Sequence, residues 1–416
     1  MPMRALLATH GTRGDVEPFV AAGRELVRRG HDVSVAVAPH MCGFVESAGL
    51  EAVAYAPEPA AFQPDSAKWF FELCTPWQGD GNLARDAQGQ NPLAAIGEMM
   101  EHVGRAWAES CTALATLAKG ADLLLVNKYE QDRAAIVAEY HDIPLAVLSS
   151  FPGEPSSPGG MIGDIFTDAE SAQRRALGLP EAPGPFEPLQ IQAYDKLCFP
   201  DAATELAKQG GRSPFVGTLT LELPTDADDE VLSWIAAGTP PIYFGFGSMP
   251  IEYPADTITA IGAACSHLGE RALICAGWSD FSEVPQFEHV KVVDTVNFAT
   301  TFPNCRAVVH HGGAATTAAS LRAAVPTLIL WFWVQDQPMW AAAIERLGVG
   351  RGRAFSASTA ASLVADLRSI LTPQCVSRAR EVAAQMTTPA QSVAMAADLL
   401  EEAVRLGRSA AVTSPT

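Results

Sequence analysis

Short apolar runs alternate with segments of helical periodicity from the start of the chain. Residues 4–9 form a continuous apolar run that is bounded by Gly11, and apolar positions then recur with a helical period over residues 16–29. Gly30 follows as a C-terminal cap, and a second, β-branched run covers residues 33–37. Such runs are typical of parallel strands covered on both faces, so the first fifty residues predict one βαβ unit.

The same alternation continues in two halves. In the first half, strands are predicted at 123–126 and 145–148, with a helix at 132–140 between them. After Gly217, the second half predicts strands at 242–246, 272–276, 291–293, 307–309 and 327–331, and helices at 256–268, 315–324, 338–347 and 390–406.

This order of elements predicts an α/β protein with two Rossmann-like parallel-sheet domains. We assign residues 1–215 to the first domain, 216–390 to the second, 391–408 to a C-terminal helix and 409–416 to a frayed tail. Ligands of such sheets bind at the carboxyl ends of the strands, so we expect the site in a deep cleft between the two domains.

Residues 57–110 are less regular than the rest of the first half. They hold several aromatic residues, among them Trp69, Phe70, Trp77 and Trp107. This content suits a pocket for a large apolar molecule, and ordinary core packing explains it equally well.

Composition and charge narrow the function. Hydrophobic residues make up 48% of the 416 residues, which supplies packed cores and excludes a disordered chain. Acidic residues outnumber basic ones by 47 to 28, and the net charge of −19 disfavours nucleic-acid binding, which needs a basic surface. The eight cysteines are scattered without a CxxC pair, and the longest apolar stretch, 323–334, is too short to span a bilayer. We therefore expect a reduced, soluble, cytoplasmic protein without a signal peptide.

The most informative segment joins an apolar strand to a helix through two histidines and two glycines. It reads Val309-His310-His311-Gly312-Gly313-Ala314-Ala315-Thr316-Thr317. Glycines let the backbone approach a ligand, and a helix N-terminus offers unpaired amides and a partial positive charge, so this turn suits a pyrophosphate. A plain strand-to-helix turn with a threonine cap is the alternative. A metal site is disfavoured, because adjacent side chains at a strand end point apart.

A second polar turn follows the strand at 327–331. Asp336 and Gln337 precede Pro338 at the start of the next predicted helix. A carboxylate beside an amide can accept from and donate to neighbouring hydroxyls, which sugar recognition requires. Capping of the helix by Asp336 is the alternative.

A third turn, from Thr9 to Val16, follows the first strand and places Asp15 at a helix start. Asp15 is either a general base in the cleft or only an N-cap. The glycine spacing lacks the third glycine of the dinucleotide fingerprint, and residues 245–249 lack the last glycine of a nucleophile elbow. Both absences count against an NAD enzyme and against a hydrolase of the elbow type.

Together these segments resemble the inverting glycosyltransferases of family 1, which have the two-domain GT-B fold. The similarity is greatest to the subgroup of glycopeptide-antibiotic, glycopeptidolipid and sterol 3-O-glucosyltransferases. The matching motifs are Gly11-Thr12-Arg13-Gly14-Asp15-Val16-Glu17-Pro18, Gly245-Phe246-Gly247-Ser248, Gly277-Trp278, His310 to Thr317 with Ala315 in place of a glycine, Asp336-Gln337-Pro338, and Leu347 to Gly350. They follow the family's order and form a specific set.

The resemblance implies a role for each matching residue. The diphosphate of a UDP- or dTDP-sugar donor would be held by Thr12, Ser248, His311, Gly313, Thr316 and Thr317. Its nucleoside would lie near Trp278, Asp294, Thr295 and Val296, and its sugar against Asp336 and Gln337. Asp15 would be the general base toward a hydroxyl of an apolar acceptor, whose pocket would include His10, Trp69, Phe70 and Trp77. The C-terminal helix would cross back to the first domain.

The implied reaction is one in-line displacement at the anomeric carbon, with a base on the acceptor side. The helix dipole and His311 would stabilise the leaving diphosphate, so we expect neither a metal ion nor another cofactor. We reject Asp226-Ala227-Asp228 as a metal motif because it lies in a predicted exposed linker. Plant members have a histidine where this chain has Asp15, and Asn127 stands at the position of their second carboxylate, so no such dyad is expected.

Two other functions share this architecture. One is a catalytically silent nucleotide-binding partner protein, against which the retained Asp15, His311 and Asp336 argue. The other is a nucleotide-sugar epimerase, which has no need of a large aromatic segment in its first half. The sequence leaves open the sugar, the acceptor, peripheral contact with a membrane, and whether the protein is a monomer or a dimer.

Overall fold

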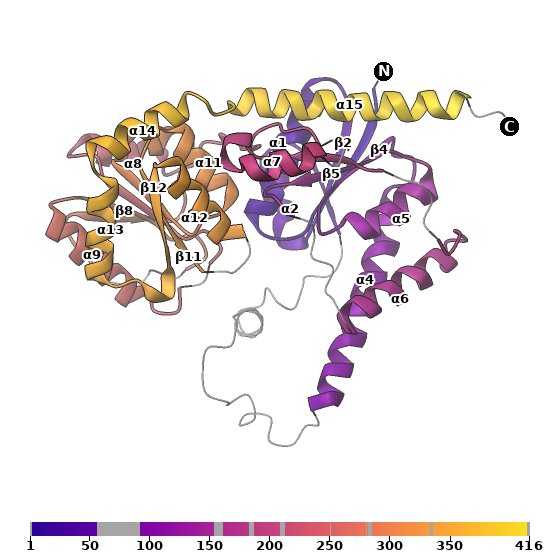
Figure 1. Ribbon diagram of the computed structural model, residues 1–416, viewed down its shortest axis with the longest axis horizontal. Coiled ribbons are helices and arrows are strands. Elements are labelled where there is room, and N and C mark those ends of the chain that lie inside the picture. Colours follow the sequence, from indigo (N-terminus) through magenta and orange to yellow (C-terminus); the bar gives the residue numbers. More distant parts are fainter. Residues whose placement is uncertain are drawn as a thin grey trace.

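The computed structural model describes residues 2–55, 92–153, 161–182, 187–208, 213–249, 251–279, 281, 285–332 and 336–413. Two lobes lie side by side, and each is built on a parallel sheet of six strands (Figure 1). The first sheet has the order β3-β2-β1-β4-β5-β6, and the second has the order β12-β11-β10-β7-β8-β9. The predicted α/β class with two parallel-sheet domains is confirmed.

The first lobe, which we call the N-terminal domain, alternates strands with helices. Its strands are β1 (Arg4–Ala8), β2 (Asp32–Val37), β3 (Glu51–Ala54), β4 (Leu123–Asn127), β5 (Leu145–Ser149) and β6 (Leu189–Gln192). Its helices are α1 (Arg13–Arg28), α2 (Cys42–Ser47), α4 (Pro92–Leu117), α5 (Gln131–His141), α6 (Met161–Ala176) and α7 (Pro200–Lys208), with 3-10 turns η1 (Pro39–Met41) and η3 (Lys196–Cys198).

The second lobe, the C-terminal domain, repeats this plan. Its strands are β7 (Ile242–Gly245), β8 (Ala272–Cys275), β9 (Val290–Val293), β10 (Ala307–His310), β11 (Thr327–Trp331) and β12 (Gly350–Ala354). Its helices are α8 (Asp228–Ala236), α9 (Pro254–Leu268), α10 (Phe298–Thr301), α11 (Ala314–Arg322), α12 (Asp336–Leu347), α13 (Ala360–Ile370) and α14 (Pro373–Ala383), with 3-10 turns η4 (Phe302–Asn304) and η5 (Phe355–Ala357). The final helix, α15 (Pro389–Thr413), leaves this lobe.

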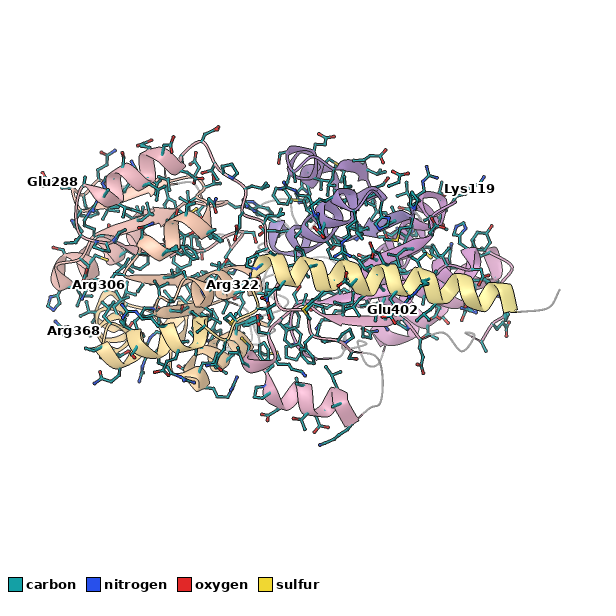
Figure 2. The ribbon with its side chains drawn as sticks, turned by 90° about the horizontal axis from the view of Figure 1, so that it is seen from above. Lys119, Glu288, Arg306, Arg322, Arg368 and Glu402 are labelled. Atoms are coloured by element: carbon teal, nitrogen blue, oxygen red, sulfur yellow. The ribbon has the colours of Figure 1, made fainter. Side chains whose placement is uncertain are left out.

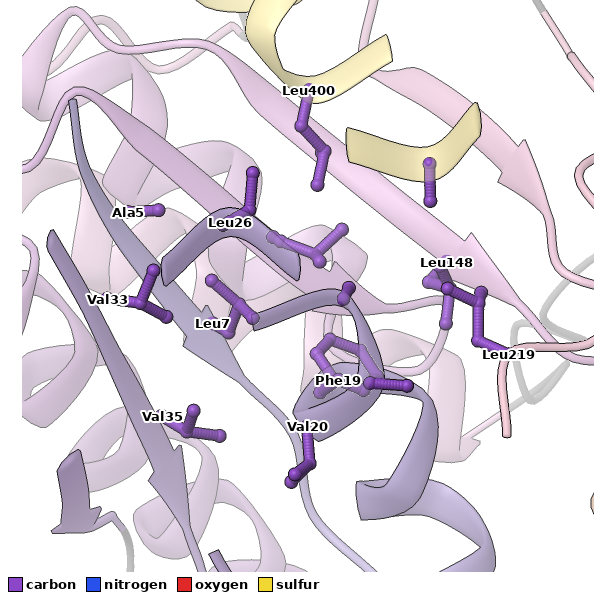
Figure 3. Packing of buried hydrophobic residues seen from close by; sticks show 14 of the residues in the cluster. Ala5, Leu7, Phe19, Val20, Leu26, Val33, Val35, Leu148, Leu219 and Leu400 are labelled. Atoms are coloured by element: carbon purple, nitrogen blue, oxygen red, sulfur yellow. The ribbon is translucent and has the colours of Figure 1, made fainter. Parts of the chain in front are cut away.

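Strand β1 separates two hydrophobic cores, because successive side chains of a strand point to opposite faces of the sheet. Leu7 belongs to the core that α1 covers, whereas Leu6 belongs to the core under α4 and α5. Figure 3 shows the first of these cores, in which Leu400 descends from α15 toward Leu26 of α1. The last helix is therefore held by apolar burial on the N-terminal domain.

Helix α15 crosses the N-terminal domain along its upper side in Figure 1, as the resemblance implied. Arg29 Nη1 donates to Asp398 Oδ1 at 2.6 Å and to Glu401 Oε2 at 3.2 Å. The helix continues to Thr413, past its predicted end at residue 408, and the fraying of the tail stays a prediction. Ala410 and Ala411 are strong helix formers, which accounts for the extension.

Polar side chains tie together the two passages of the chain between the domains. Arg322 of α11 donates to the Thr218 carbonyl at 2.7 Å and to the Thr387 carbonyl at 2.9 Å. The amide and the hydroxyl of Thr387 both donate to Asp195, at 2.8 and 2.7 Å. Figure 2 places Arg322 between the lobes, near the start of α15. The predicted division at residue 215 falls between β6 and β7, and the boundary itself stays a prediction.

The structure differs from the predicted elements in several places. Residues 92–117 form the helix α4, although 57–110 was expected to be irregular. Strands β3, β6 and β12 were not predicted; β12 reads Gly-Arg-Gly-Arg-Ala and owes its extended form to parallel pairing with β11. The described helices include none with both the length and the apolar composition needed to cross a bilayer.

Candidate active site

The carboxyl ends of the two sheets face each other. On the N-terminal side, η1 follows β2 and carries His40, whose ring lies 6.3 Å from the Trp278 ring beyond β8, edge to face. The charge of Asp15, at the start of α1, also raises the pKa of Asp336, at the start of α12. We call these two surfaces the facing edges: the loops after β1, β2, β4 and β5 on one side, and those after β7, β8, β10 and β11 on the other.

Glycines shape the C-terminal facing edge around one imidazole. A Cβ atom at Gly247 would lie 2.8 Å from His311 Cε1, and one at Gly313 would lie 2.7 Å from His311 Nε2. Gly247 has a φ of +61°, which side chains rarely adopt, and its carbonyl accepts from the Trp278 amide at 3.1 Å. The loops after β7, β8 and β10 therefore meet at His311 through backbone contacts that only glycine permits.

His311 and His310 are both neutral, for the same physical reason. Burial lowers the pKa of His311 to about 4, and the nearby Gly245 carbonyl opposes this only weakly. Burial also holds the pKa of His310 well below its ordinary value. The Gly312 amide donates to His310 Nδ1 at 3.0 Å, so His310 shapes the turn, while His311 beside it is half-buried.

Helix α11 begins directly after this turn, with Gly313 as its N-cap. The amides of its first turn precede the first helical hydrogen bond, so they are free to meet an anion. Thr316 is half-buried and lies in this turn. Thr317, the other predicted threonine ligand of this turn, is fully buried: its hydroxyl donates to the Gly313 carbonyl at 2.9 Å, and its amide makes a helical bond to the same oxygen. Neither group faces outward.

Asp336 and Gln337 open α12 but point to different partners. Burial raises the pKa of Asp336 to about 6, and the charge of Asp15 adds to this, while that of Lys128 opposes it. Gln337 is buried; its Oε1 accepts from the Phe332 amide at 2.7 Å, and its Nε2 contacts Met249 Sδ at 3.5 Å. The Gln337 amide thus joins the loops after β11 and β7, and its contact with sugar hydroxyls stays a prediction.

Asp15 stands at the N-terminal facing edge, locked by its own loop. Its Oδ2 accepts from the Thr12 amide at 2.8 Å and from the Thr12 hydroxyl at 3.4 Å. A Cβ at Gly11, where φ is +123°, would collide with the carboxylate. Burial raises the pKa of Asp15 above its ordinary value, although water reaches the side chain. Asp15 is thus surrounded by protein on several sides and still reached by water, as a carboxylate in a cleft would be.

A second polar cluster, which the sequence did not reveal, surrounds His10. Its Nδ1 bonds the Glu130 carboxylate, and its ring lies 4.5 Å from that of Tyr55. The other oxygen of Glu130 accepts from Tyr55 at 3.2 Å and pairs with Arg133 at 2.8 Å. Burial works to raise the pKa of Glu130, but the Arg133 and His10 interactions lower it to about 2. His10 Nε2 is left without a partner, and His10 thus has a fixed ring and one unused nitrogen.

The loop after β4 brings further groups to the same edge. Asn127 Nδ2 donates to the Thr9 hydroxyl at 2.9 Å, and its Oδ1 accepts from the Tyr129 amide at 2.9 Å, so Asn127 shapes the turn. Lys128 follows, almost completely buried, and Tyr129 is 53% exposed. The signal for these residues was their position, since polar residues directly after a predicted parallel strand lie at the ligand-binding edge.

The remaining predicted residues fall into three groups. Trp278, Asp294 and Thr295 are exposed after β8 and β9, and Ser248 is half-buried after β7. Val296, by contrast, is buried in the core with Phe302, so only its backbone could meet a nucleoside. Trp69, Phe70 and Trp77 lie outside the described residues.

Comparison with known proteins agrees with this architecture. Residues 5–78 match the glycosyltransferase family 28 N-terminal domain, and residues 273–405 match the C-terminal domain of the erythromycin biosynthesis protein CIII-like family. An uncharacterized glycosyltransferase of Mycobacterium tuberculosis is 52% identical over 432 positions, which cover 98% of this chain and 100% of that protein. Glycosyltransferase GtfE of Amycolatopsis orientalis is 30% identical, with 97% and 98% covered.

Solved structures show the same fold at low identity. The calicheamicin glycosyltransferase CalG4 superposes with a TM-score of 0.70 at 18% identity, over 97% of this chain and 98% of that one. The spinosyn rhamnosyltransferase SpnG, complexed with thymidine diphosphate, gives a TM-score of 0.66 at 17% identity, over 94% and 99%.

Proposed function

Since the chain belongs to the GT-B glycosyltransferases of family 1, we propose that it moves a hexose or deoxyhexose from UDP or dTDP to a hydroxyl of an apolar acceptor, with inversion at the anomeric carbon. The acceptor class is a natural product, a glycolipid or a sterol-like molecule. The observation that carries this proposal is the pairing of a glycine-built turn around His311 with Asp15 on the opposite facing edge.

The C-terminal facing edge suits the nucleoside diphosphate. Its turn offers the first-turn amides of α11, the positive end of the helix dipole and the His311 ring, with Ser248 beside them. Because His311 is neutral in the free protein, it meets the diphosphate as a hydrogen-bond donor, and the bound negative charge favours its protonation. Trp278 offers an exposed ring for the nucleobase of the donor, and Asp336 offers a carboxylate for the hydroxyls of its sugar.

The N-terminal facing edge supplies the base. The acceptor oxygen attacks the anomeric carbon and forms the new C–O bond as the bond from that carbon to the diphosphate oxygen breaks. The diphosphate departs with the bonding electron pair, and the hydroxyl proton passes to the Asp15 carboxylate. The raised pKa of Asp15 makes it a better proton acceptor than an exposed aspartate. Charge on the leaving diphosphate is offset by α11 and His311, so we propose that no metal ion is required.

His10 is proposed to contact the acceptor beside Asp15. Its Nδ1 donates to the Glu130 carboxylate, which fixes the ring, and its unused Nε2 can accept from an acceptor hydroxyl. The names of the relatives, which include antibiotic glycosyltransferases and a sterol 3-beta-glucosyltransferase of Arabidopsis thaliana, support an apolar acceptor. We place the reaction in the cytoplasm, because every cysteine that the structure describes is a free thiol, which suits a reducing compartment.

The test is a donor screen followed by product analysis. Thermal unfolding with UDP, dTDP and GDP identifies the nucleotide, since a bound ligand raises stability by mass action. The matching nucleotide sugars are then incubated without acceptor and with a panel of apolar alcohols. Two results support the proposal. The donor is hydrolysed slowly without acceptor, and the transferred sugar has the opposite anomeric configuration in the product, for example β from an α-linked donor. Nucleotide binding without hydrolysis or transfer indicates a silent partner protein, and an isomerised donor indicates an epimerase.

A further inference from the structure

Lys128 is a buried ammonium at the N-terminal facing edge with no assigned function. Only 5% of the residue is exposed. Its Nζ donates to the carbonyls of Phe151 at 3.4 Å and Gly153 at 3.3 Å, and lies 3.5 Å from the Phe151 ring centroid. Burial of a charge costs free energy that an apolar side chain would avoid, so packing alone does not account for a lysine here.

The surroundings of Lys128 leave one donor unused. An ammonium has three N–H groups, and the two carbonyls accept two of them. Within the described ranges, Lys128 forms no ion pair at 4.0 Å or less. The charge of Asp336 nevertheless acts on the amine, against the burial that lowers its pKa to about 8. Asp336 therefore lies near enough for its charge to act on the amine without forming a direct ion pair with it.

Four side chains from three elements influence one another electrostatically where the two edges meet. The pKa of Tyr129 is raised to about 12, mainly by partial burial and further by the charges of Asp336 and Asp15. The charge of Asp15 raises the pKa of Asp336, and the charge of Lys128 lowers it. Asp15 comes from α1, Lys128 and Tyr129 from the loop after β4, and Asp336 from α12. Two carboxylates and one ammonium disfavour an anionic group here and favour a neutral group that can both accept and donate.

We propose that Lys128 binds a hydroxyl of the donor sugar, which accepts the free N–H of Nζ and donates its own proton to Asp336. A hydroxyl has both functions on one atom, so it fits between an ammonium and a carboxylate. This inference rests on the proposed function and extends it, because the sugar then touches both domains while the nucleoside diphosphate touches mainly the C-terminal one. Lys128 thus contributes to sugar specificity from the acceptor side.

The test separates the sugar from the nucleotide by calorimetry. UDP, dTDP, UDP-glucose and dTDP-glucose are titrated into wild type, Lys128→Met, Lys128→Arg and the control Lys119→Met, which removes an exposed lysine of the same domain. Lys128→Met should bind the nucleotide sugar about tenfold more weakly, as for loss of a charge-assisted hydrogen bond. It should keep its affinity for the bare nucleotide within about twofold. Lys128→Arg should recover part of the loss, and Lys119→Met should match wild type.

The pH dependence gives a second readout that a purely structural lysine would not move. Lys128 favours the charged form of Asp336, so its removal should shift the acid limb of kcat/KM for the donor, expected near pH 6, to higher pH. Equal weakening of nucleotide and nucleotide sugar, or no change in either, would overturn the inference, and a thermal melt of each variant checks its folding. If wild type binds no nucleotide at all, the proposed function fails together with the inference.

Discussion

The two facing edges share one scaffold and differ in what they are made of. Both lie at the carboxyl ends of parallel six-stranded sheets. The C-terminal edge is built from backbone: Gly247, Gly277 and Gly312 have positive φ, and the histidine at its centre is neutral. The N-terminal edge is built from ionisable side chains, among them Asp15 and Lys128, whose charges both affect the pKa of Asp336.

This difference suits the two halves of one reaction. A diphosphate carries its own charge and needs many oriented donors, which backbone amides and a helix N-terminus provide without a cost for burying side-chain charge. An alcohol carries no charge and must lose a proton, which requires a group that titrates. The same fold therefore holds a leaving group on one edge and a base on the other.

The largest expected effect lies at the N-terminal edge. Asp15→Asn should lower kcat about 10²–10⁴-fold, because it removes the proton acceptor while it keeps the shape of the side chain. UDP or dTDP affinity should stay within about twofold. Asp201→Asn, which changes an exposed carboxylate on α7, is the control. Turnover by Asp15→Asn above about a third of the wild-type value would show that another group takes the proton.

The next effect lies at the C-terminal edge. His311→Ala should weaken binding of the free nucleoside diphosphate about 10–100-fold, since one charge-assisted hydrogen bond is lost. Asp336→Ala should leave that affinity almost unchanged and lower turnover, because its partner is the sugar. Calorimetric titration of both variants measures the contrast. An equal loss in the two would mean that sugar and diphosphate are not bound by separate groups.

The backbone character of the C-terminal edge can be tested with single methyl groups. Gly313→Ala and Gly247→Ala place a Cβ within 2.8 Å of the His311 ring, so each should weaken nucleotide binding about tenfold. Gly43→Ala is the matched control, because a Cβ there meets no atom within 4 Å. Unchanged affinity in both test variants would show that the ring can move aside at no cost.

The sequence predicted the facing edges better than their inner contacts. Asp15, His311 and Asp336 were identifiable because each follows a predicted strand and precedes a helix. Thr317 and Gln337 are buried, which a linear motif does not reveal because it does not tell which face of a helix turns inward, and their predicted contacts with the donor stay predictions. The pairing of His10 with Glu130 joins residues 120 positions apart, and only the parallel pairing of β1 with β4 brings them together.

The smallest expected effect is a change with pH. His311 has a pKa of about 4 when free, and bound diphosphate favours its protonated form, so the pKa rises on binding. Affinity should therefore grow as pH falls through the pKa of the bound state. The phosphate itself titrates near pH 6, so the readout is the difference between wild type and His311→Ala from pH 8 to pH 5.5. If the difference in affinity between wild type and His311→Ala became smaller toward low pH, His311 would not gain a proton when the diphosphate binds.

The central claim is that the nucleotide and the base belong to opposite edges. One paired titration tests it most directly: calorimetry of UDP or dTDP into Asp15→Asn and His311→Ala, beside wild type. The account predicts a wild-type dissociation constant for Asp15→Asn and one about 10–100-fold higher for His311→Ala. The reverse pattern, with nucleotide affinity lost in Asp15→Asn and kept in His311→Ala, would contradict the assignment of donor and base to the two domains.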